Sequence, residues 1–266
     1  MRLVIAIIAV VPACAWDDGE PFGVVEARLA TAWTLRADRG GTWQRLASDF
    51  EVEVTSGRAE LGELALIDRG TAALAFDPAD PPPGYTLCHN GHCHADGGRL
   101  VSYEEISAEL GGGGGPTPVL TLAVGARDLV PGGEAALGCD GPCELPLATI
   151  GRVELAVARL ELAGRVRDRR QPPRLTGEVA WTLALDRTGD AAPVRGDVEL
   201  PVDRGHDPRI TLAAGFAPTA ALLDGVDFAQ AGAGPWELDT DATARAAVEA
   251  ALTELPLAVT TDRHPF

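Results

Sequence analysis

A seven-residue segment, CHNGHCH at positions 88–94, stands out because it concentrates imidazole and thiol groups. It holds three of the five histidines and two of the five cysteines of the chain. Neutral imidazole is a good ligand for Cu(II) and Zn(II), and thiolates suit softer ions. In an extended segment, His92 and His94 fall on the same face, two residues apart. The segment therefore predicts a copper or zinc site. The candidate ligands are His89, His92, His94, Cys88 and Cys93, with the two cysteines either bridged or ligating.

Two further cysteines, Cys139 and Cys143, enclose the turn residues Asp-Gly-Pro, as Cys88 and Cys93 enclose Asn-Gly. Apart from Cys14 the chain has four cysteines, and an even number in an oxidising compartment predicts disulfides, either within each segment or across the two. A disulfide at the first segment allows two interpretations. The histidines form a preorganised metal-binding cluster, or the segment is a stapled polar loop of a structural or protein-binding protein that holds no metal.

Other chemistry for the same segment remains open. Four thiolates, from both cysteine pairs, would make a tetrahedral zinc site, although the spacings C-x4-C and C-x3-C differ from the usual C-x2-C. A widened haem-attachment motif would use Cys88, Cys93 and His94, with His206 or His264 as the sixth ligand; the standard motif has two intervening residues. Asp96 is a candidate further ligand or hydrogen-bond partner of a ligating histidine.

The N-terminus predicts export. Leu3 to Val11 is an unbroken apolar run, too short to cross a bilayer as a helix but typical of a secretory signal over residues 1–13. Val11-Pro12-Ala13-Cys14 is similar to a bacterial lipobox, which predicts lipidation of Cys14, a tether over 14–22, and a periplasmic or outer-membrane location. Cleavage after Ala15 is the alternative, and it would release a protein that begins at Trp16.

Composition narrows the classes of function. The formal net charge is −17, so nucleic acid and anionic lipid surfaces are not expected partners, whereas a membrane contact through the anchor and a protein partner in the envelope are. All 22 cationic residues are arginine, which excludes a Schiff-base lysine and a phosphate-loop lysine. No G-x-S-x-G or His-Glu-x-x-His motif occurs. The sequence therefore predicts no enzyme.

The hydrophobic pattern has a period of two, typical of strands with one buried face. Phe50, Val52 and Val54 alternate with polar residues, as do residues 153–157, 179–185 and 198–202. We therefore expect an all-β fold, an antiparallel β-sandwich over residues 23–266, with a division near the glycine run 111–115 as an alternative. Two helices are expected: a short one from Ser102 to Leu110, and one capped by Asp239 or Thr240 that ends at Leu255.

The stretch 83–110, PGYTLCHNGHCHADGGRLVSYEEISAEL, together with the lipobox-like segment, resembles a recurring segment of uncharacterised bacterial envelope lipoproteins from GC-rich genomes. A fainter similarity is to secreted copper-binding partners of di-haem proteins, whose chains also carry four cysteines after a signal. The first resemblance implies no known activity. No ligand of the second family aligns with a residue of this chain.

Overall fold

The structure, a computed structural model, describes residues 21–35, 41–69, 77–89, 92–103, 106, 118–187, 189, 191–232 and 234–266. The predicted signal segment, Cys14 and most of the tether lie outside the described residues. Among the described helices, none has the length and apolar character needed to span a bilayer.

The larger of the three sheets is built on two long antiparallel strands, β3 (Phe50–Asp68) and β10 (Ala148–Asp168). The edge of β10 that faces away from β3 pairs with β11 along one part of its length and with β12 along the other. The edge of β3 that faces away from β10 pairs with β2 and then with β7. A short strand, β14, extends the sheet beyond β11. The added strands are β2 (Gln44–Arg45), β7 (Pro118–Val130), β11 (Glu178–Asp186), β12 (Val194–Val202) and β14 (Trp236–Glu237).

The pairing of β3 with β7 shows where the chain leaves the seven-stranded sheet before the CHNGHCH segment and where it returns afterwards. Ile67 lies opposite Pro118, so the chain leaves the sheet after β3 and returns beside it. Residues 69–117, called the excursion below, therefore begin and end on neighbouring strands. The glycine run 111–115 lies outside the described residues, and the division expected there stays a prediction. β3, which precedes the excursion, and β7, which follows it, belong to one sheet.

The second sheet has five strands, with β1 (Gly23–Thr31) at its centre. Its other strands are β8 (Gly133–Leu137), β9 (Glu144–Leu145), β13 (Arg209–Phe216) and β15 (Ala258–Asp262). β1 pairs with β13 in parallel, and so does β11 with β14 in the larger sheet. The sheets are therefore mixed, with these two parallel pairings among antiparallel ones, because alternation along a strand reports its buried face and not the direction of its partner.

Both large sheets bury their inner faces in one hydrophobic core. Val25, Ala27 and Leu29 of β1 and Val153 and Leu155 of β10 belong to the same buried cluster. The expected alternation is present along β11, where every second side chain from Val179 to Leu185 is buried. The all-β prediction is confirmed.

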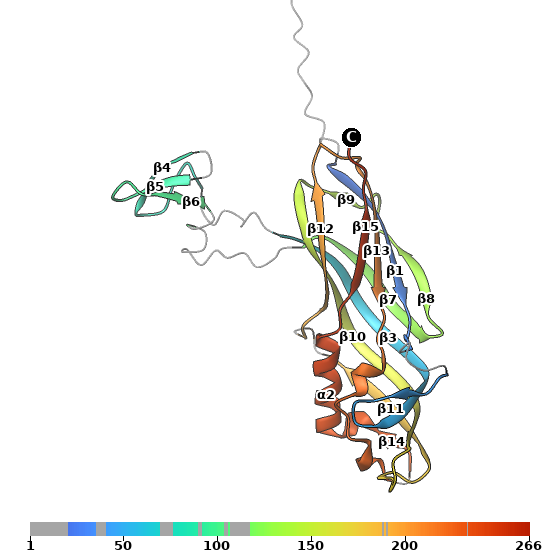
Figure 1. Ribbon diagram of the computed structural model, residues 1–266. Coiled ribbons are helices and arrows are strands. Elements are labelled where there is room, and N and C mark those ends of the chain that lie inside the picture. Colours follow the sequence, from blue (N-terminus) through green and yellow to red (C-terminus); the bar gives the residue numbers. More distant parts are fainter. Residues whose placement is uncertain are drawn as a thin grey trace, which may run out of the picture.

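Helical segments cover the end of the larger sheet near β11 and β14 (Figure 1). They are η1 (Ala220–Leu223), η2 (Phe228–Ala231), η3 (Leu238–Thr240) and α2 (Ala242–Thr253). Phe228 packs edge-on against Phe50, Trp181 and Trp236, with ring centroids 5.6–6.2 Å away.

The C-terminal helix occurs as expected, but its cap differs. Asp241, and neither Asp239 nor Thr240, accepts hydrogen bonds from the backbone of Thr243 and Ala244. Residues 238–240 form η3 instead, and the Asp239 carboxylate accepts from the backbone of Ala184. Of the helix expected at 102–110, Tyr103 and Ile106 are described, both in helical conformation, and Ser102 ends β6 (Leu100–Ser102). The remainder lies outside the described residues.

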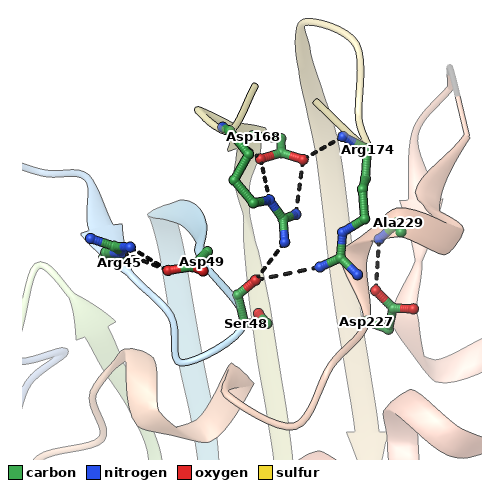
Figure 2. Close-up of polar contacts among 8 residues, drawn as sticks. Arg45, Ser48, Asp49, Asp168, Arg174, Asp227 and Ala229 are labelled. Atoms are coloured by element: carbon green, nitrogen blue, oxygen red, sulfur yellow. Dashed lines mark hydrogen bonds and ion pairs between the residues drawn. The ribbon is translucent and has the colours of Figure 1, made fainter. Parts of the chain in front are cut away.

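A buried carboxylate fixes the turn after β10 (Figure 2). Asp168, whose side chain is 0% exposed, accepts two hydrogen bonds from the Arg170 guanidinium, at 2.7 and 2.8 Å, and one from the backbone of Arg174 at 2.6 Å. Arg170 in turn donates to the carbonyl of Ser48 and lies 4.4 Å over the ring of Phe50. The bonds from Arg170 hold the pKa of Asp168 well below its usual range.

The Asp168→Asn substitution should lower the free energy of unfolding by about 2 kcal/mol, because it removes charge-assisted hydrogen bonds to a buried group. Since the folded-state pKa is lowered, this contribution is fully present above the unfolded pKa of about 4 and is lost progressively as the pH falls from there through the folded-state pKa. The difference from wild type should therefore shrink in acid. Urea unfolding at pH 7 and pH 3 measures both effects.

The matched control for this substitution is Asp49→Asn, which weakens the half-exposed pair with Arg45 drawn in the same figure. Surface pairs of this kind contribute about 0–1 kcal/mol. Equal losses in the two variants would contradict the structural role assigned to Asp168.

Candidate metal centre

The CHNGHCH segment lies in a third sheet, formed by the excursion alone. Its strands are β4 (Tyr85–His89), β5 (His92–Ala95) and β6, and both pairings are antiparallel. Figure 1 labels these strands in a small sheet separate from the two larger ones. The sheet has its own small core, in which Cys93, Val101 and Ile106 are the buried members.

The pairing of β4 with β5 puts like residues opposite each other. Cys88 lies opposite Cys93, and His89 lies opposite His92. The register shifts between Thr86 and Cys88, where Leu87 has a positive φ of 39°. Such a bulge sets two residues against one on the partner strand. It thereby places Thr86 on the same face as His89, which strict alternation would have prevented.

The two cysteines form a disulfide on the core side of this hairpin. Cys93 is fully buried, and Cys88 packs partly buried against the same cluster. A three-stranded sheet of this length has little apolar area to bury, so a covalent link between two strands contributes much of its stability. A second disulfide joins Cys139 to Cys143 in the main body, where Cys143 is part of the main core. The prediction of disulfides is confirmed, and of the two pairings left open the structure has the one within each segment.

The three histidines occupy the opposite face of the hairpin and converge. One ring nitrogen from each lies within 4.8 Å of the corresponding atoms of the other two. The Nε2 atoms of His89 and His94 are 3.4 Å apart. Two nitrogens bound to one tetrahedral zinc ion at ~2.0–2.1 Å each are ~3.4 Å apart, so this pair already has the spacing of a chelate. The His89, His92 and His94 side chains together can hold a metal ion.

The disulfides change the predicted ligand set. Cys88 and Cys93 have no free thiolate in this structure, so their assignment as ligands is corrected to a structural role. The four-thiolate zinc site fails for the same reason, because Cys139 and Cys143 are bridged as well. Haem attachment through thioethers also requires free cysteine thiols, and both candidates are bonded to each other.

Other predicted participants lie elsewhere. His206 belongs to the main body, where its Nδ1 lies 2.8 Å from the carboxylate of Asp203, and His264 follows β15. Asp96 is not part of the converging group. Its backbone N–H donates to the carbonyl of Gly84, which closes the far end of the hairpin. Cys14, the predicted lipidation site, lies outside the described residues.

Comparisons of the chain with protein-family models, with curated proteins and with solved structures found no match. The protein is therefore classified by its fold and its histidine cluster alone. It is an all-β protein that carries, between two neighbouring strands, a small disulfide-closed sheet with a cluster of three histidines.

The Cys88→Ser/Cys93→Ser variant should bind Zn(II) at least about tenfold more weakly than wild type, because the strands that align the histidines lose their covalent link. Isothermal titration measures the affinity. The matched control is Cys139→Ser/Cys143→Ser, which removes the other disulfide and should leave the Zn(II) affinity unchanged. Equal affinity in both variants would show that the disulfide does not position the histidines.

Proposed function

We propose that the protein is a metal-binding lipoprotein of the bacterial cell envelope, which holds one Cu(II) or Zn(II) ion through His89, His92 and His94. The observation that carries this proposal is the convergence of the three ring nitrogens on one face of the hairpin. Three imidazoles suit both ions, and the absence of a free thiolate from the described ligand group favours Cu(II) over Cu(I).

The envelope location is supported by separate features. Disulfides persist in oxidising compartments, and two are present. The apolar run before Cys14 and the lipobox-like residues around that cysteine favour export and lipid attachment. An anchor of this type would hold the metal site at a membrane without requiring a membrane-spanning segment.

The metal-binding proposal is tested by titrating oxidised, purified protein with CuSO₄ and with ZnSO₄. Wild type should bind one ion per chain, and the His89→Ala/His92→Ala/His94→Ala variant should bind at least about a hundredfold more weakly because all ligands are removed. His264→Ala is the control, since that exposed histidine belongs to the main body, and it should bind as wild type does. Equal, substoichiometric metal in wild type and the triple variant would leave a stapled loop with no metal.

The anchor is tested by fractionating cells that express wild type or Cys14→Ser. Wild type should pellet with membranes and incorporate radiolabelled palmitate, whereas Cys14→Ser should incorporate none, because the thiol that receives the lipid is missing. A soluble wild-type protein with Trp16 at its N-terminus would show instead that the signal is cleaved after Ala15.

A further inference from the structure

Four positions on the outer face of β4 and β5 form a square, and histidine occupies three of them. His89 lies opposite His92, and Thr86 lies opposite His94. Directly opposed residues on one face of an antiparallel pair have Cβ atoms about 4.5–5.5 Å apart, so all four side chains are neighbours. The hydroxyl of Thr86 donates to the backbone carbonyl of His94 at 3.3 Å. A neutral hydroxyl is not a usual ligand of Cu(II) or Zn(II), so this corner offers no comparable donor.

The described residues supply three ligands and no fourth. The converging group consists of His89, His92 and His94, with no carboxylate or cysteine among the described residues joining it. His89 and Thr86 are exposed, and the other two histidines are half-buried. The core of the small sheet lies on the other face, around Cys93. Within the described part of the chain, an ion bound by the three imidazoles therefore keeps a coordination position on the solvent side, toward Thr86.

Metal sites with three protein ligands retain a water or another exchangeable ligand, and they expand their coordination when a further donor enters. We infer, on the basis of the proposed function, that this is an exchange site: the ion passes directly from the three histidines to an acceptor molecule that offers nitrogen donors. A closed site with four protein ligands must first lose one of them, whereas this site admits the acceptor while the protein still holds the ion.

The transfer needs no electrons. A nitrogen of the acceptor replaces the bound water and forms its bond to the ion, giving a complex that contains protein, ion and acceptor together. Further acceptor nitrogens then bind as the three histidine-to-metal bonds break one after another. The imidazoles are left neutral, the ion keeps its charge and oxidation state, and water reoccupies any position the acceptor leaves free.

The test follows transfer of Zn(II) from loaded, oxidised protein to the chromophoric chelator 4-(2-pyridylazo)resorcinol, which binds through pyridyl and azo nitrogens as well as an oxygen. Direct transfer predicts that the observed rate rises in proportion to chelator concentration. A rate independent of chelator, with Zn(II) still bound stoichiometrically beforehand, would overturn the inference while leaving the proposed function intact. Wild-type protein that takes up no Zn(II) would overturn the proposed function itself.

Thr86→His supplies a fourth imidazole at the open corner and should slow the transfer at least about tenfold while tightening Zn(II) binding. Thr86→Val is the matched control: it keeps the β-branched shape, adds no ligand, and should transfer at the wild-type rate. If Thr86→His and Thr86→Val transferred Zn(II) equally fast with equal affinity, the open position would not lie at this corner.

Discussion

β3 and β10 pair antiparallel almost from end to end, from Phe50 opposite Asp168 to Asp68 opposite Ile150. Each strand then uses its outer edge twice, for two shorter strands in succession. This pair supplies side chains to the core between the sheets. Phe228 of the helical cover packs on Phe50 of β3, and the buried carboxylate of Asp168 lies at the end of β10. The excursion depends on this pair too, because its base is closed by the pairing of β3 with β7. The site is thus carried by a scaffold whose register is fixed along two long strands.

The two faces of the small sheet have different roles: one face packs in its core, and the other carries the histidines. Cys88 and Cys93 face a core of very few buried residues, and the histidines that alternate with them face outward. Neighbouring residues along β5 therefore have opposite tasks, with Cys93 holding the strands together and His92 and His94 meeting His89 above them. Because sulfur is occupied by the bridge, the converging group offers nitrogen donors alone.

The sequence predicted the all-β fold because alternation marks half-buried strands directly, and it located the histidine cluster because three of the five histidines of the chain lie within seven residues. It did not predict the parallel pairing of β1 with β13, since alternation looks the same in both directions. The convergence of His89 with His92 had a signal: Asn-Gly between two histidines is typical of a two-residue hairpin turn. The bulge at Leu87 had no signal in the sequence, because leucine rarely adopts a positive φ and its residue type therefore predicts a regular strand there.

The pairing of Ile67 with Pro118 is the last of the β3–β7 ladder, so the excursion begins and ends at one end of that ladder. Replacing residues 70–117 with a tight turn would join two strands that are already neighbours, and the pairing of Asp68 with Ile150 would be kept. The histidine hairpin is connected to the main body through the ends of two adjacent strands, β3 and β7. The histidine hairpin is therefore an insertion between neighbouring strands, the kind of position at which proteins tolerate insertions and deletions.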